Sequence, residues 1–263
     1  MSTIREAATV ILLRDAQVPE AFLLRRRRGA SFMASAFVFP GGGVDTGEAN
    51  DVAALRELFE EAGVLIASDS AGAPVDPVTA AALRRRVAAG EPANQVLAAA
   101  GYRWDTSALH PWSHWITPSV EPKRFSAKFW VARLPSGYEP SFDDNETVEQ
   151  RWTTCAAALA AVGELRLPPP QIRTLYEMQH FASVAEIVAA AQQRAGFAAT
   201  ILPRAASHPQ GLCLLLPWDP AYLSAGQGDA LAIEPLPAWA DGPTRFILDG
   251  HAWRYQHAHE GAL

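Results

Sequence analysis

Residues 42–64 read GGVDTGEANDVAALRELFEEAGV, and this stretch is the most informative part of the chain. A glycine-rich turn precedes a run that we expect to be helical from about Ala49 to Ala62. Gly63 is expected to stop the helix, because glycine readily takes the left-handed backbone conformation found after a last helical turn. Val64 then begins a short apolar segment. The stretch therefore predicts a loop followed by an amphipathic helix.

The predicted helix separates acidic from apolar side chains. At 100° per residue, Glu57, Glu60 and Glu61 fall within an arc of about 100°. The opposite side carries the apolar residues Val52, Leu55, Phe59 and Ala62. The apolar side can pack on a sheet while three carboxylates project into a cleft. Several oxygen ligands on one rigid element are what hard divalent cations need.

Other residues of the stretch suit the same site. Gly42 lets the backbone come close to a metal or a phosphate, which a Cβ atom would hinder. Glu48 lies near the helix start, where exposed N–H groups favour a carboxylate. Arg56 can hold a carboxylate by a bidentate pair. An amphipathic helix with a solvated acidic face is the ordinary alternative, but the complete spacing of these residues favours a functional site.

The spacing resembles the signature of the Nudix hydrolase family, and every defined position from Gly42 to Val64 is filled. The resemblance implies an α/β fold, the Nudix α/β/α sandwich with a mixed sheet. It also implies hydrolysis of a nucleoside diphosphate linked to another moiety. It further implies that Glu57, Glu60 and Glu61 bind Mg²⁺ or Mn²⁺, with the carbonyl of Gly42 as a further ligand. The general base differs between family members and stays open here.

Flanking motifs resemble one branch of the family, the group that contains the peroxisomal coenzyme A diphosphatase. They are Phe32-Met33, Val38-Phe39-Pro40-Gly41-Gly42, His114-Trp115-Ile116-Thr117-Pro118 and Arg124-Phe125. A coenzyme A signature in that group has an arginine and a glycine where this chain has Ser31 and Ser35. Because a serine cannot hold a phosphate bidentately, we predict that coenzyme A is a poor substrate.

The rest of the chain suggests two parts. We expect a Nudix domain over residues 6–167, with a helical insertion at about residues 69–109, and an α+β extension over residues 168–263 packed on it. Pro168-Pro169-Pro170 is interpreted as a semi-rigid, extended connection. The extension is expected to contain amphipathic helices and a hairpin that turns at Asp249-Gly250. It should pack on the Nudix domain or complete a homodimer.

Secondary candidates lie outside the motif. One pair of the arginines at positions 25–28 faces either the cleft, where it would bind phosphate, or solvent. Glu146 is slightly favoured over Glu149 as a further metal ligand or base. His114 is expected to be structural. Four aromatic residues are expected to be core, with base stacking as the alternative: Trp112, Trp115, Phe129 and Trp130.

Composition narrows the class of protein. The formal charge of −6 argues against a nucleic-acid partner and leaves a small diphosphate substrate as the expected one. Two cysteines, no apolar stretch typical of a signal peptide and no long apolar run predict a cytoplasmic protein without a membrane partner. The alternative to an enzyme is a Nudix-like ligand-binding or regulatory domain without turnover, which loss of an acidic position would favour.

Overall fold

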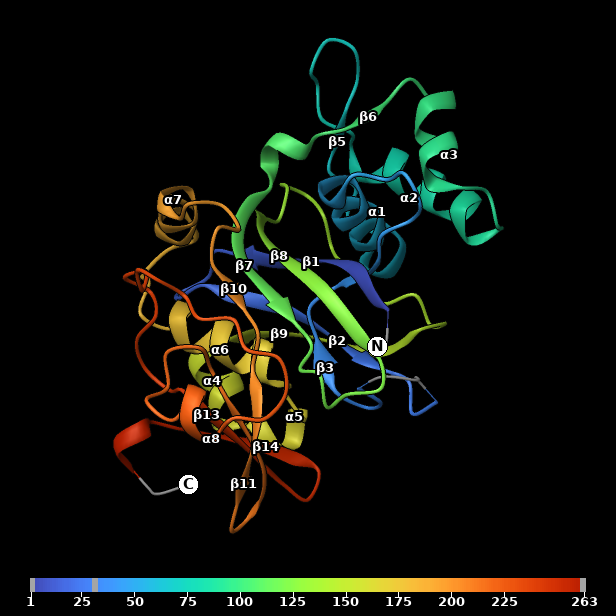
Figure 1. Ribbon diagram of the computed structural model, residues 1–263. Helices are drawn as coiled ribbons and strands as arrows, with labels where there is room; N and C mark the ends of the chain where they lie inside the picture. Colours follow the sequence, from blue (N-terminus) through green and yellow to red (C-terminus); the bar gives the residue numbers. More distant parts are fainter. Residues whose placement is uncertain (1–2, 30–32, 261–263) are drawn as a thin grey trace.

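The computed structural model describes residues 3–29 and 33–260, and its centre is a mixed β-sheet (Figure 1). Strands β1 (Ile4–Arg14) and β8 (Arg124–Arg133) pair in parallel at the middle of this sheet. Its other strands are β2 (Glu20–Arg26), β3 (Phe37–Val38), β4 (Gly41–Gly43), β7 (His110–Ile116), β9 (Thr147–Thr154) and β10 (Thr200–Ile201). The order is β10-β7-β8-β1-β2-β3, with β4 also paired to β1 and β9 to β2.

Helices cover both faces of the sheet (Figure 1). Val10 and Leu12 of β1 belong to one core with α1 (Asn50–Ala62), whereas Ile11 and Leu13 belong to the core on the other face. Successive side chains of a strand point to opposite faces, so burial on both sides explains why β1 is apolar almost throughout. The Nudix-type α/β/α sandwich with a mixed sheet is therefore confirmed.

The insertion packs beside α1 as two helices, as the sequence predicts (Figure 1). Its elements are β5 (Ala67–Ser68), α2 (Pro77–Ala88), α3 (Ala93–Ala99), β6 (Arg103–Trp104) and the 3₁₀ turn Thr106–Ala108. Asp76 caps α2 by accepting hydrogen bonds from the backbone N–H groups of Val78 and Thr79. Gly90 and Gly101 have positive φ angles just beyond the two helices, which confirms the helix ends expected from the sequence.

The triple proline does not form an extended connection, and that interpretation is wrong. The helices on this side are α4 (Cys155–Ala160), α5 (Val162–Leu165), α6 (Pro169–Met178) and α7 (Val184–Gln193). Pro168 is the N-cap of α6, and Pro169 and Pro170 form its first turn. Proline suits this place because the first N–H groups of a helix have no intrahelical partner and its φ is already helical.

The C-terminal part adds a second sheet below α4, α5 and α6 in Figure 1. Its elements are β11 (Arg204–His208), β12 (Gly211–Leu215), α8 (Tyr222–Ala225), β13 (Arg245–Asp249), β14 (Ala252–Gln256) and the 3₁₀ turn Ala258–Glu260. The predicted hairpin is present as β13–β14, but its turn lies one residue later than expected. Asp249 pairs with Ala252, so the turn residues are Gly250, which has a φ of 60°, and His251. The core beneath α6 is shared with β1. The division at residues 167 and 168 stays a prediction.

Candidate active site

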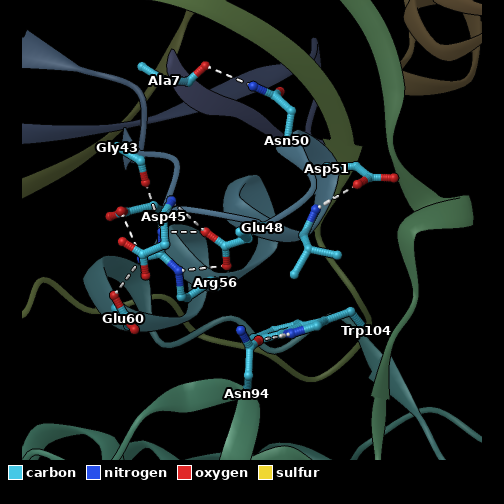
Figure 2. Close-up of polar contacts among 12 residues, drawn as sticks. Ala7, Gly43, Asp45, Glu48, Asn50, Asp51, Arg56, Glu60, Asn94 and Trp104 are labelled. Carbon is cyan, nitrogen blue, oxygen red and sulfur yellow. Dashed lines mark hydrogen bonds and ion pairs between the residues drawn. The ribbon is translucent and has the colours of Figure 1, made fainter. Parts of the chain in front are cut away.

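Arg56 gathers the acidic residues of the motif around one buried guanidinium group (Figure 2). Its Nε and Nη2 atoms each donate to a different carboxylate oxygen of Glu48, both at 2.9 Å, and Nη2 also donates to the carbonyl of Gly43 at 2.8 Å. Nη1 donates to Glu57 at 2.8 Å and to Glu60 at 3.2 Å. The expected bidentate pair is therefore made with Glu48, and Arg56 joins the loop to the helix.

Glu48 lies just before the start of α1, as expected, and its side chain anchors Arg56. The N-cap of α1 is Ala49, without a side-chain cap, and Glu48 accepts from the backbone N–H of Asp45 at 3.2 Å. Burial opposes ionisation of Glu48, but hydrogen bonds from Arg56 and Asp45 hold its pKa below its usual value. Asn94 of α3 also lies near enough to Glu48 to lower its pKa. The insertion thus reaches the motif.

Glu61 is the most deeply buried of the three expected metal ligands, with a residue exposure of 5%. It accepts a hydrogen bond from the backbone N–H of Gly41 at 2.9 Å. Burial raises the pKa of Glu61 to about 8, against that hydrogen bond and with repulsion from Glu57 and Glu146. Burial likewise raises the pKa of Glu57 to about 7, although Arg56 opposes the shift. The site concentrates carboxylates that a cation would stabilise in the ionised form.

Gly42 is required for steric reasons. A Cβ atom at this position would lie 2.5 Å from the carboxyl carbon of Glu57. Any side chain would therefore push Glu57 out of its place beside the loop. This close approach gives a steric reason for glycine at the first position of the motif, independently of backbone conformation.

The donor chemistry of the site fits a hard divalent cation, but the side chains are not arranged as a finished cage. In residues 3–29 and 33–260, no three acidic, histidine or cysteine side chains converge as metal ligands. Arg56 draws Glu57 and Glu60 toward itself, and the Gly41 amide holds Glu61. The carboxylates would have to turn away from these partners to share one ion. Their grouping on one helix and their oxygen chemistry suit Mg²⁺ or Mn²⁺.

The structure separates the secondary candidates. Arg25 forms an ion pair with Glu149 at 2.7 Å, which occupies both side chains. Arg26 lies near Glu61, lowers its pKa and has a buried Nε atom without a hydrogen-bond partner within the described residues. Glu146 repels Glu57 and Glu61 electrostatically and so lies near them. Arg26 and Glu146 are thus the members of these sets that lie at the site.

Most of the aromatic candidates are core residues. Trp112, Trp115 and Phe129 are buried in the core shared with α6. Trp130 is half-buried, and its Nε1 donates to Asn50 at 3.0 Å. His114 bonds to neighbouring side chains on β8 and β10, which agrees with a structural role.

Sequence reasoning missed Gly41, Arg84 and Asn94. Gly41 acts through its backbone N–H, which no side-chain pattern reveals. Arg84 and Asn94 belong to the inserted helices. Arg84 donates hydrogen bonds to the motif helix, and Asn94 lies near enough to Glu48 to lower its pKa. The only sequence signal for Arg84 was a run of three arginines in α2, which is typical of a solvated helix face.

Comparisons with known proteins agree with this geometry. The family model described as the NUDT19 Nudix domain matches residues 46–181. A protein named putative nudix hydrolase 7, from Caenorhabditis elegans, is 32% identical over 70% of this chain and 62% of its own length. The human protein named acyl-coenzyme A diphosphatase NUDT19 is 29% identical over 65% of this chain and 50% of its own length. The chain thus spans about half to three fifths of these relatives.

A solved structure agrees as well. The NUDIX hydrolase from Alicyclobacillus acidocaldarius is matched over 76% of this chain and 100% of its own, with a TM-score of 0.66 and 27% identity. None of the helices in the described residues has the length and apolar composition needed to cross a membrane. The motif geometry, the family model and this fold agree, and the chain belongs to the Nudix hydrolase family, in the branch of the NUDT19 Nudix domain.

Proposed function

We propose that this protein hydrolyses the diphosphate linkage of a nucleoside diphosphate joined to another moiety. The observation that supports the proposal most strongly is the acidic face of α1, where Glu57, Glu60 and Glu61 lie together beside the glycine loop. No acidic position of the motif is lost, so nothing favours the alternative of a binding domain without turnover.

The metal would be held by Glu57, Glu60, Glu61 and the carbonyl of Gly42. When bound, Mg²⁺ or Mn²⁺ would neutralise diphosphate oxygens and lower the pKa of a water molecule. Arg56 keeps the carboxylates on one side of the helix through its contacts with Glu57 and Glu60. The metal-binding role of these ligands and the positioning role of Arg56 are both proposals for this chain.

Two further residues are proposed to act on the substrate. Glu146 would accept a proton from the attacking water, because it lies near Glu57 and Glu61 while Glu149 is paired with Arg25. Arg26 would bind a phosphate oxygen through its guanidinium group, because its charge lies near Glu61. Both side chains come from strand ends that meet, since the Arg27 N–H donates to the Glu146 carbonyl at 3.1 Å.

Two observations bear on which compound of this class is the substrate, and they point in different directions. Two relatives are named acyl-coenzyme A diphosphatase, which favours coenzyme A compounds. Ser31 and Ser35 replace the arginine and glycine of the coenzyme A signature, which favours another substrate. We retain the prediction that coenzyme A and its acyl forms are hydrolysed less efficiently than the best alternative.

The experiment is a comparison of kcat/KM with Mg²⁺ and with Mn²⁺. The panel contains coenzyme A, an acyl-coenzyme A, ADP-ribose, NADH, a nucleotide sugar and a dinucleoside polyphosphate. Release of two phosphorylated products from one compound supports the proposed function. Absence of turnover on the whole panel with both metals contradicts it, and an acyl-coenzyme A or coenzyme A at the top contradicts the substrate prediction.

Removal of a single carboxylate charge tests the site. We predict that Glu60→Gln or Glu61→Gln lowers kcat at least about 100-fold, because a metal ligand is lost. The fold should be retained, since amides replace carboxylates whose pKa is already raised by burial. Glu164→Gln, at an exposed position, is the control. Wild-type turnover in both site variants, with folding confirmed by circular dichroism, would remove these residues from the mechanism.

A further inference from the structure

The inserted helix α2 sends one arginine to the end of the motif helix. Arg84 Nη2 donates to the carbonyls of Glu60 at 3.0 Å and Glu61 at 2.9 Å. The last carbonyls of a helix have no intrahelical partner, so a cation there satisfies them and interacts favourably with the helix dipole. Arg84 thus holds the backbone of two proposed metal ligands.

The same guanidinium group also holds the segment between β8 and β9. Nη1 donates to the hydroxyl of Ser141 at 2.7 Å, and Nη2 donates to the Ser141 carbonyl at 2.9 Å. The Ser141 N–H in turn donates to the Ala62 carbonyl at 3.0 Å. Arg84 and Ser141 therefore close the end of α1 together. We call residues 139–146 the base loop, because it leads to Glu146.

The absence of a side chain at Gly63 lets the Arg84 guanidinium approach the end of α1. A Cβ atom on Gly63 would lie 2.6 Å from Arg84 Nη1, so the guanidinium occupies the space that a side chain would need. Gly63 also has a φ of 71° and ends α1 in the left-handed conformation. The last glycine of the motif thus serves two purposes in this chain, one conformational and one steric.

The base loop transmits the contact at Ser141 to Glu146. Asp143 accepts hydrogen bonds from the N–H groups of Glu146 at 3.0 Å and Thr147 at 2.9 Å. Gln150 accepts from the Phe142 N–H at 2.7 Å. The loop is therefore folded on itself by side chains. It is held to the rest of the protein at Ser141 by Arg84, and at Glu146, whose carbonyl accepts from the Arg27 N–H at 3.1 Å.

We propose that Arg84 is a positioning residue that fixes the base loop against the end of α1 and so, together with the bond from the Arg27 N–H, keeps Glu146 near Glu57 and Glu61. Its role in catalysis rests on the proposed function. The insertion then stabilises the active site through Arg84, in addition to any contact it makes with substrate. A shift of the proton acceptor by about 1 Å is enough to cost on the order of 100-fold in rate.

A double-mutant cycle tests the proposal in the full-length chain. Arg84→Met removes the guanidinium while keeping a long apolar side chain. With ADP-ribose and Mg²⁺, and in parallel with an acyl-coenzyme A, we expect kcat to fall about 10- to 100-fold with KM changed less than about threefold. In a Glu146→Gln background the same substitution should cost less than about threefold, because the group it positions is gone. Equal losses in both backgrounds would overturn the proposal.

Two comparisons separate positioning from general destabilisation. Arg86→Met on the same helix is the matched control, since the Arg86 side chain pairs with exposed Glu91, and it should behave like wild type. Hydrogen exchange should become faster in residues 139–146 and in the last turn of α1 for Arg84→Met, and not for Arg86→Met. Unchanged exchange there would overturn the proposal. If the wild type hydrolyses none of the panel, the proposed function fails, and exchange alone decides whether Arg84 fixes the loop.

Discussion

Ser35 occupies the position where the coenzyme A signature has glycine, four residues before Phe39. Its φ is 62°, in the left-handed region that glycine adopts at little cost. Where the signature has glycine, this chain therefore has a serine in a backbone conformation that favours glycine. Ser31, the other departure, lies outside the described residues.

Replacing Ser35 tests this conformation directly. We predict that Ser35→Gly stabilises the protein by roughly 0.5–1 kcal/mol, because relief of left-handed strain exceeds the added flexibility of the unfolded chain. Ala36→Gly should destabilise it instead, since Ala36 is buried and its φ is not positive. Urea unfolding of both variants measures the effect. A loss of stability in Ser35→Gly would contradict the conclusion that the positive φ strains Ser35.

At the scale of the elements, α6 and α7 are joined by a buried ion network. Glu177 of α6 lies between Arg173 of the same helix, at 2.7 Å, and Arg194 just beyond α7, and its side chain is 7% exposed. The Arg194 guanidinium also stacks on Trp112 of β7 at 3.6 Å from the ring centroid. Glu177 thus lies between two buried cations, of which Arg173 also pairs with exposed Asp241 at 3.4 Å.

We predict that Glu177→Gln costs roughly 3–5 kcal/mol of unfolding free energy. The amide leaves two buried guanidinium groups without their shared counter-charge. Glu164→Gln is the matched control. The Glu164 side chain is 67% exposed, so its ion pair with Arg151 should contribute less than about 1 kcal/mol to stability. Chemical denaturation of both variants decides the point, and equal small losses would show that the network is not essential.

Strand β10 is held to the sheet through His114. The Thr200 hydroxyl and the Ser126 hydroxyl each lie 2.9 Å from one ring nitrogen of His114. Burial lowers the pKa of His114, the charge of Lys128 lowers it further, and Glu6 opposes both. The neutral ring is therefore the form that suits this contact.

The lowered pKa predicts a pH dependence with a definite sign. Below the ordinary histidine pKa of 6.5, the unfolded chain binds the proton that the folded protein resists, so stability falls as the pH is lowered. His114→Gln should remove this part of the dependence. Melting temperatures of both proteins at pH 7.5 and pH 5.5 measure it. If the melting temperature falls equally between pH 7.5 and pH 5.5 in the wild type and in His114→Gln, groups other than His114 are responsible.

At the scale of the whole molecule, the C-terminal part completes both the sheet and the core of the Nudix fold. Strand β10 pairs in parallel with β7 at the sheet edge. Ile172 and Leu175 of α6 are buried in one core with Ile11 of β1. The expectation that the extension packs on the preceding part agrees with these contacts, and a homodimer stays a prediction.

Truncation after Pro170 should therefore give an unstable or aggregation-prone protein. The cut would remove α6 after its first turn, expose the apolar face beneath it and leave β7 as an open edge. Size-exclusion chromatography and thermal melting of the truncated chain test this. A soluble fragment with the melting temperature and activity of the full chain would show that the extension is independent.

The local features of this protein follow from its sequence. The position of α1, its end at Gly63, the caps of α2 and the turn at Gly250 depend on residues within a few positions of one another. The acidic face and the family likewise follow from the spacing within residues 42–64. Helical periodicity and capping are short-range properties, so one sequence is enough to read them.

The long-range arrangement was decided only by the tertiary structure. Arg84 reaches carbonyls more than twenty positions earlier in the chain, and the pairing of β2 with β9 brings Glu146 near Glu57. The prolines after residue 167 begin a helix because a core was present to receive α6; by themselves they fit an extended connection equally well. Such contacts depend on which surfaces meet after folding, and no local spacing in the sequence encodes them.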